Sequence, residues 1–187
     1  MSRFSLIFII LLTGCQLVTP REAGWTMLGD GYYQLLDRWP GQPQQLVQQI
    51  SWQNSAQQQQ FLLTVLLQRD TTLIVAISPL GQELWRMQYS DGHKMTLSGV
   101  APFIQPAFAR NLLAQMQLAL LDESLLAPRL RGLVLQREAD RRNLLDARQY
   151  RVLQIDNPGQ ISEGDRITLS GPDYQLTILT LQRDLLP

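Results

Sequence analysis

The 187-residue chain carries 16 Lys and Arg residues against 16 Asp and Glu residues, so its formal net charge near neutral pH is zero. This balance excludes the basic excess with which proteins attract nucleic acids or anionic lipid headgroups. A single cysteine excludes an internal disulfide, and 45% hydrophobic residues in a chain of this length can build the core of one domain.

The first fifteen residues have the pattern of a bacterial secretion signal. Arg3 is the only charged residue before an apolar run from Phe4 to Leu12, and the small residues Thr13 and Gly14 precede Cys15. The run has about half of the roughly 20 residues that cross a bilayer, so it does not predict a transmembrane anchor.

Residues 12–15, Leu-Thr-Gly-Cys, resemble the bacterial lipobox. The resemblance implies cleavage before Cys15 and acylation of that cysteine; an ordinary signal peptide with a chance cysteine is the alternative. We expect residues 1–14 to be a lipoprotein signal peptide, residues 15–24 to be the lipidated cysteine and a tether, and residues 25–187 to form one domain. Gln16, where an aspartate would favour the inner membrane, indicates the periplasmic face of the outer membrane.

The first half of this domain is predicted to be mostly strand. A small helix is expected between Asp30 and Trp39, before Pro40-Gly41 ends it. Leu46, Ile50 and Trp52 then alternate with polar residues, which is typical of a half-buried strand.

Two nearly unbroken apolar runs follow, Phe61–Leu67 and Leu73–Ile77. They predict a hairpin whose two faces are both covered. The turn Pro79-Leu80-Gly81 leads into an alternating strand, Leu84–Tyr89, and Asp91-Gly92 predicts a tight turn into a further strand at residues 95–97.

The apolar period then changes to that of a helix of about fifteen residues, from near Phe108 to near Asp122. Four later strands are predicted, at Leu133–Gln136, Tyr150–Ile155, Arg166–Ser170 and Tyr174–Leu181. A meandering antiparallel sheet of this size usually curls. The predicted class is therefore α+β, a curled sheet forming an incomplete β-barrel with helices on its open side.

This order of elements resembles the LolA and LolB family of lipoprotein carriers and receptors, which fold as an incomplete barrel with an apolar cavity for acyl chains. The closest local match runs from Ile50 to Leu84, with Ile50-Ser51-Trp52-Gln53 and the Pro-Leu-Gly turn followed by Glu83-Leu84. The resemblance implies that Leu80, with Pro79 and Gly81, forms a loop that engages the membrane during lipid transfer. A turn leucine folded back onto its own sheet is the alternative.

The whole chain also resembles a family of short bacterial lipoproteins encoded beside aryl polyene and related fatty-acid synthesis genes. These proteins share the lipobox, a similar turn and a C-terminal run of strands. The resemblance implies that an aryl polyene lipid is one candidate cargo.

Apolar strand residues are the candidates for a cavity lining, because a run without alternation buries both faces and one of them is free to meet a ligand. Simple core packing is the alternative for each. The candidates are Trp52, Leu63, Val65, Ile74, Trp85 and Met87.

Catalysis and cofactor binding find little support in the sequence. His93, the only histidine, follows a predicted turn; no Cys/His cluster, serine-elbow or phosphate-loop motif is present. Asp122-Glu123 is expected to be a solvated helix end, and residues 137–142 a polar surface segment. We therefore expect the protein not to be an enzyme and to bind neither a cofactor nor a metal ion.

Three classes of function remain, in this order. The first is a lipid-binding protein that accepts an acylated lipid or lipoprotein, for example from a LolA-like periplasmic carrier, and helps deliver it to the outer membrane. The second is an accessory lipoprotein that binds an envelope protein or synthesis complex without transporting lipid. An enzyme acting on acyl or glycolipid substrates comes third.

Overall fold

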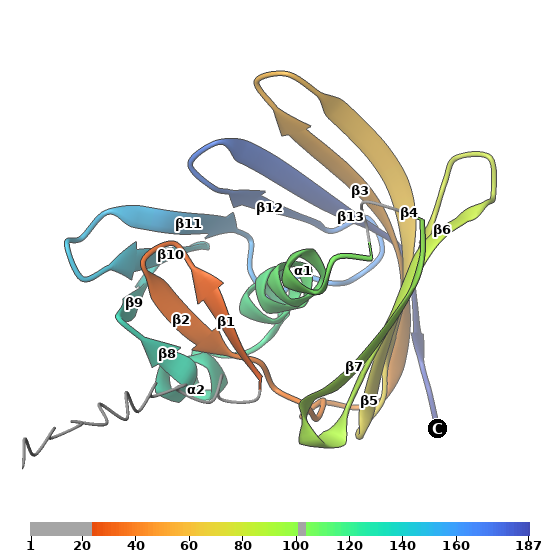
Figure 1. Ribbon diagram of the computed structural model, residues 1–187, viewed down its shortest axis with the longest axis horizontal. Helices are drawn as coiled ribbons and strands as arrows, with labels where there is room; N and C mark the ends of the chain where they lie inside the picture. The colour runs from red at the N-terminus through yellow and green to blue at the C-terminus, as the bar shows by residue number, and fades with distance from the viewer. Residues whose placement is uncertain (1–23, 101–103) are drawn as a thin grey trace, which may run out of the picture.

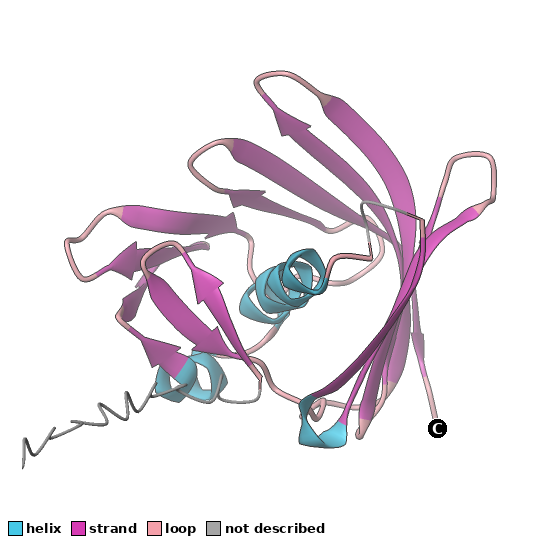
Figure 2. Ribbon diagram, viewed as in Figure 1, coloured by secondary structure: helices cyan, strands magenta, loops and turns pink. Residues whose placement is uncertain are grey.

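The computed structural model describes residues 24–100 and 104–187 and is dominated by antiparallel sheet, with two α-helices (Figures 1 and 2). The predicted α+β class is confirmed. A ten-stranded sheet has the order β7-β6-β5-β4-β3-β13-β12-β11-β10-β9, and a three-stranded sheet has the order β1-β2-β8. Cys15 and the expected signal peptide lie outside the described residues.

The first half of the large sheet is a meander in which inward side chains are more buried than outward ones. Its tight turns let each strand pair with the next, as the sequence predicted. The strands are β3 (Gln44–Asn54), β4 (Gln58–Leu67), β5 (Thr71–Ile77), β6 (Glu83–Ser90) and β7 (Lys94–Gly99). A short 3-10 turn, Asp91–His93, joins the last two.

The second half is another meander, formed by the C-terminal strands. They are β9 (Leu133–Glu138), β10 (Arg141–Asp146), β11 (Arg151–Asp156), β12 (Arg166–Ser170) and β13 (Tyr174–Leu185). β10 was not predicted from the sequence. Residues 137–142, expected to be a polar surface segment, lie in the β9–β10 hairpin, in which Glu138 pairs with Arg141. Residues 137–141 are exposed as expected, whereas Arg142 is only 4% exposed.

The two meanders join where β13 pairs with β3, from Tyr174 opposite Asn54 to Leu185 opposite Gln44. β7 and β9 are the sheet's two edges, so the sheet curves but does not close into a barrel (Figure 1). We call the end that carries the β3–β4, β5–β6 and β12–β13 turns the open end. Antiparallel pairing places all three turns there.

Helix α1 (Pro106–Leu120) lies against the concave face of the sheet (Figure 1). Its 15 residues match the predicted helix, and Pro106 begins it because a first-turn proline loses no intrahelical hydrogen bond. Buried Gln117 fixes the helix to the N-terminal segment: its amide oxygen accepts from the Tyr33 hydroxyl and the Leu36 N–H, and its amide donates to the Leu36 carbonyl. A short helix, α2 (Glu123–Leu126), and a 3-10 turn follow. Within the described residues, neither helix is long and apolar enough to cross a membrane.

The small sheet consists of two N-terminal strands, β1 (Trp25–Leu28) and β2 (Gly31–Gln34), and of β8 (Leu130–Arg131), which pairs with β2. The helix expected between Asp30 and Trp39 is therefore wrong. Gly29, at a φ of 56°, and Asp30 make a two-residue hairpin turn, and Tyr33 and Leu35 alternate inward as strand residues do. The backbone freedom of Gly29 decides in favour of the hairpin.

The β4–β5 hairpin is covered on one face only, so the prediction of two covered faces is wrong. Burial alternates along both strands. The outward side chains are half-buried by their neighbours in the sheet, and no second layer of the described chain packs over them. This outer strip consists of Leu62, Leu66, Leu73, Val75 and Ile77.

Candidate functional site

A groove of about 680 Å³ opens between α1 and the inner face of the sheet at its open end. We call it the main groove. Its apolar wall is formed by Trp52, Phe61, Ala107, Phe108, Leu112 and Leu176. Its polar lining is formed by Gln57, Gln59, Gln105, Asn111, Gln115 and Tyr174. None of these lining residues carries a formal charge.

The groove exists because the strands extend further than the helix that covers them. Inward residues deep in β4, such as Val65 and Leu67, are buried, whereas Phe61 near its open end is only half-buried. Trp52 lies directly opposite Leu176 of β13, and Phe61 is its diagonal neighbour on β4. These side chains form an apolar inner surface that is left without a covering helix turn.

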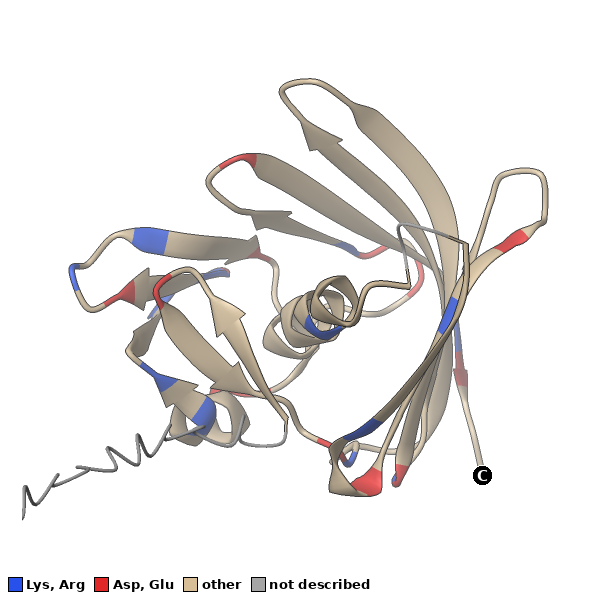
Figure 3. Ribbon diagram, in the orientation of Figure 1, with Lys and Arg blue, Asp and Glu red and all other residues tan. Residues whose placement is uncertain are grey.

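The charge pattern of the chain contributes to the same surface. No Asp, Glu, Lys or Arg occurs between Arg38 and Arg69, and β5 carries none either. Figure 3 accordingly shows β3 and β4 without charged residues, while charges are spread over other strands and the hairpin ends. The wall of the main groove is neutral as a consequence.

The floor of the main groove is closed. Below Leu112 and Leu176 only a void of about 10 Å³ remains, lined in part by Ile50, Leu63 and Ile74. A void of this size holds at most one water molecule. The main groove is therefore bounded inside, and open to solvent at one end.

The six residues predicted to line a cavity separate into three groups. Trp52 lines the main groove. Leu63 and Ile74 line the small void beneath it. Val65, Trp85 and Met87 are buried in the core, and the Trp85 ring packs edge-on against the Phe108 ring with 6.4 Å between centroids.

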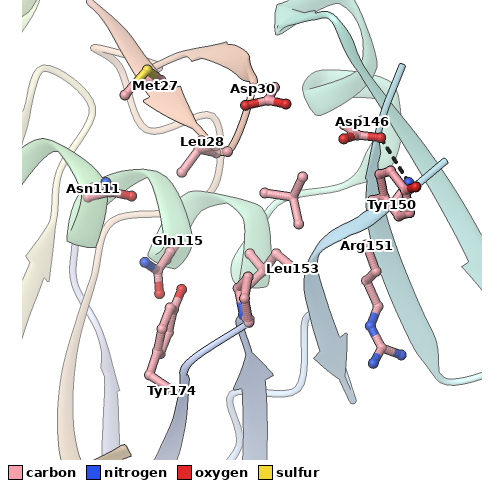
Figure 4. Close-up of a pocket in the computed structure, with 13 residues that line it drawn as sticks. Met27, Leu28, Asp30, Asn111, Gln115, Asp146, Tyr150, Arg151, Leu153 and Tyr174 are labelled. Carbon is pink, nitrogen blue, oxygen red and sulfur yellow. Dashed lines mark hydrogen bonds between the residues drawn. The ribbon is translucent and has the colours of Figure 1, made fainter. Parts of the chain in front are cut away.

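A second, more polar cavity of about 370 Å³ lies beside the main groove, next to the β1–β2 and β10–β11 turns (Figure 4). We call it the side hollow. It contains the charged side chains Asp30, Asp146 and Arg151. Asp146 accepts from the Arg148 and Tyr150 N–H groups, so one of its oxygens is occupied in the turn.

Asn111, Gln115 and Tyr174 line both cavities and mark the junction between them. Asn111 and Gln115 are one helical turn apart on the same face of α1, and Figure 4 shows the Tyr174 ring directed toward Gln115. Within the described part of the chain, none of the three side chains forms a hydrogen bond to another residue. Burial raises the pKa of Tyr174 to about 12, so its hydroxyl stays protonated at neutral pH.

Gly171 positions the Tyr174 ring at this junction. The Gly171 N–H donates to the Tyr174 carbonyl, and a Cβ at residue 171 would come within 2.3 Å of the ring. The ring can occupy its place only because residue 171 has no side chain.

The turn predicted to engage the membrane projects from the open end. The Gly81 N–H donates to the Ser78 carbonyl, and the Ser78 hydroxyl accepts from the Gln82 N–H, which closes the turn tightly. Leu80 at its tip is 88% exposed, so the alternative in which it folds back onto the sheet is not what the structure contains.

The other titratable candidates lie away from both cavities. His93 Nδ1 forms a hydrogen bond with the Tyr89 hydroxyl at 2.7 Å, at the end of the sheet opposite the open end. Arg142 donates to the Leu118 carbonyl at the end of α1 and lies 3.7 Å from Glu123; burial lowers its pKa. Across residues 24–100 and 104–187, no cluster of His, Cys, Asp and Glu could hold a metal ion.

Sequence reasoning missed most of the site. Phe61, Leu112 and Tyr174 had the apolar character of ordinary core residues, and the three junction residues carried no motif. The uncharged stretch between Arg38 and Arg69 was the one signal in the sequence that could have indicated a neutral groove wall.

Two comparisons bear on the identity of the chain. No curated protein matches it. A family model, described as a protein of unknown function (DUF3261), matches residues 45–182, which include nearly all of both meanders, α1 and every described residue that lines the main groove and its junction. The chain therefore belongs to the DUF3261 family.

Proposed function

We propose that this protein is a lipid-anchored lipoprotein of the outer membrane that binds an acyl chain in the main groove and helps deliver its lipid or lipoprotein to that membrane. One observation carries the proposal: the main groove is open and mostly apolar, and none of the described residues that line it is charged. An aryl polyene lipid is one candidate cargo.

The size and chemistry of the main groove fit a long acyl chain. Its volume of about 680 Å³ lies within the roughly 300–1,000 Å³ typical of small-ligand pockets. Each methylene group moved from water into such a surface contributes about 0.8 kcal/mol, so chain length governs affinity. A charged ligand group would find no opposite charge among the described lining residues.

The architecture is also compatible with the resemblance to LolA and LolB noted in the sequence. An open curved sheet with a helix against its concave face is the arrangement that this resemblance implies, and Leu80 is exposed in a turn at the open end of the sheet. Transfer would follow affinity, from a carrier to the groove and from the groove to the bilayer, without a nucleotide or a metal. Acyl chains on Cys15 would keep the protein at its membrane.

A second function, binding an envelope protein without transporting lipid, is favoured by a different surface. The outer strip on β4 and β5 presents half-exposed leucine, valine and isoleucine side chains on the convex face. A variant with Leu66→Ser and Val75→Ser tests it, since binding to a partner would weaken while acyl binding in the main groove would not.

The test of the proposed function fills the main groove from the helix side. Ala107 is exposed on the first turn of α1 and lines the groove, so Ala107→Trp adds bulk there without disturbing the core. Ala107→Ser is the matched control. Both are compared in the protein that starts at Gln16, titrated with a fluorescent palmitoyl methyl ester.

We expect the tryptophan of Ala107→Trp to exclude three or four methylene groups of the acyl chain from the groove. At about 0.8 kcal/mol for each methylene group, the dissociation constant should rise by roughly 50- to 200-fold. Ala107→Ser should bind as the unchanged protein does. If the unchanged protein takes up no probe, or if Ala107→Trp binds it equally well, the main groove is not an acyl site.

A further inference from the structure

Three uncharged polar side chains at the junction form no hydrogen bond to another residue of the described chain. Two of them belong to α1, and the third belongs to β13. Asn111 and Gln115 each offer two N–H donors and one carbonyl acceptor, and Tyr174 offers a hydroxyl. All three are half-buried and line both cavities. In ligand pockets a few such groups amid apolar walls fix the orientation of the ligand.

We infer that this junction holds the ester or amide linkage of an acyl lipid whose headgroup is uncharged, so that the site selects such lipids over free fatty acids and anionic phospholipids. This inference rests on the proposed function, because it requires the acyl chain to occupy the main groove. It goes further by naming the chemical class of the lipid.

The donors at the junction suit a carbonyl oxygen. The Asn111 and Gln115 amides and the Tyr174 hydroxyl are neutral donors, and an ester or amide carbonyl accepts from them without bringing a charge out of water. A carboxylate or a phosphate needs charge-assisted donors to offset its desolvation. Within residues 24–100 and 104–187, no cationic side chain lines the main groove.

The charges of the side hollow also disfavour an anionic headgroup. It presents two carboxylates, Asp30 and Asp146, against one guanidinium. The Arg151 guanidinium donates to the Gln154 amide oxygen at 2.6 Å, and in Figure 4 it points away from both carboxylates. An uncharged, hydroxyl-bearing headgroup can accept or donate there without repulsion.

The positions of the two cavities give the lipid one orientation. With its linkage at the junction, the acyl chain extends into the main groove of about 680 Å³. The headgroup extends into the side hollow of about 370 Å³, which is open to solvent beside Tyr150. A headgroup of a few polar atoms, or one that continues into a larger soluble molecule, therefore fits.

Two photoreactive probes test the selection. Palmitoyl methyl ester and palmitic acid, each with a diazirine near the chain end, are added to the full-length protein in phosphatidylcholine vesicles near neutral pH. Labelled peptides are quantified by mass spectrometry after irradiation. We expect the ester to label peptides that line the main groove several-fold more than the acid does.

Three variants separate the linkage contacts from the groove itself. Gln115→Leu and Tyr174→Phe keep the shape of each side chain, and each should lower labelling by the ester about three- to tenfold, the factor that one hydrogen bond contributes. Labelling by the acid should not change. Gln88→Leu, an exposed amide on the outer face of β6, is the matched control and should leave both probes unaffected.

The outcomes distinguish the linkage site at the junction from acyl binding in the main groove. Equal labelling of the groove by both probes, unchanged in Gln115→Leu and Tyr174→Phe, overturns the linkage site but leaves acyl binding intact. Absence of groove labelling by either probe overturns the proposed function and this inference with it. Preference for the ester that is lost in both variants supports the inference.

Discussion

The hydrogen bonds of Gln117 allow a quantitative test of how α1 is held against the sheet. Gln117 is 4% exposed and the Tyr33 side chain is fully buried. The Tyr33 hydroxyl and the Leu36 N–H reach the Gln117 amide oxygen at 3.0 and 2.9 Å, and the Gln117 amide reaches the Leu36 carbonyl at 2.7 Å. Gln117→Leu removes all of these bonds while nearly preserving the side-chain volume.

The expected cost follows from the groups left without partners. The Tyr33 hydroxyl, the Leu36 N–H and the Leu36 carbonyl each lose a hydrogen bond, and a buried polar group left unsatisfied costs about 1–3 kcal/mol. Leu36 is only half-buried, so water recovers part of its loss. We therefore expect the free energy of unfolding to fall by about 3–5 kcal/mol.

Tyr33→Phe should cost less, about 0.5–1.5 kcal/mol, because the Gln117 amide keeps both bonds to Leu36. The double variant should cost less than the sum of the single variants, since they share one hydrogen bond.

Urea denaturation followed by tryptophan fluorescence measures these differences, with exposed Gln88→Leu as the control, expected within about 0.5 kcal/mol of the unchanged protein. If Gln117→Leu lowers the free energy of unfolding by less than about 1 kcal/mol, the hydrogen bonds of Gln117 contribute little to stability. Such a result would mean that these bonds do not hold α1 as the wall of the main groove.

Two further predictions concern the open end and the buried tyrosines. Leu80→Glu should leave the free energy of unfolding unchanged but weaken binding of the domain to lipid vesicles by about 1.5–3 kcal/mol, the free energy gained by burying a leucine. Leu185→Glu, at an exposed position at the opposite end of the sheet, is the control and should not weaken vesicle binding. Equal losses of binding for both variants in a vesicle flotation assay would contradict a role for the turn. Burial raises the pKa of Tyr174 to about 12 and also raises those of Tyr33 and Tyr89, so unfolded tyrosines ionise before folded ones. The contribution of these tyrosines to the free energy of unfolding should therefore be constant from neutral pH to about pH 10 and fall as the pH rises from 10 toward 12. A flat profile in denaturant titrations between pH 10 and 12 would contradict it.

The strands and α1 could be predicted because local patterns specify them. Alternation in β3 and β6, the apolar runs of β4 and β5 and the helical period from Phe108 are all local. The β1–β2 hairpin was missed because its signal is a two-residue turn whose glycine was not distinguished from a helix-flanking residue. β10 was missed because the sequence of residues 141–143 is polar, yet Arg142 and Asn143 become buried when the sheet curls around the end of α1.

The site was harder to predict than the fold because it depends on where α1 stops covering the sheet. The sequence could not distinguish Trp52, which remains at the groove, from Trp85, which the Phe108 ring covers. Both are inward residues of alternating strands. Only the packing of α1 decides which of them meets a ligand.

Native mass spectrometry shows whether the protein carries an acyl lipid when it is isolated. The protein from Gln16 onward is isolated from the periplasm without detergent and weighed before and after organic extraction. We expect a bound acyl lipid that extraction removes and that the Ala107→Trp variant does not carry. A bare mass for the unchanged protein, together with no uptake of added palmitoyl methyl ester, would contradict this expectation.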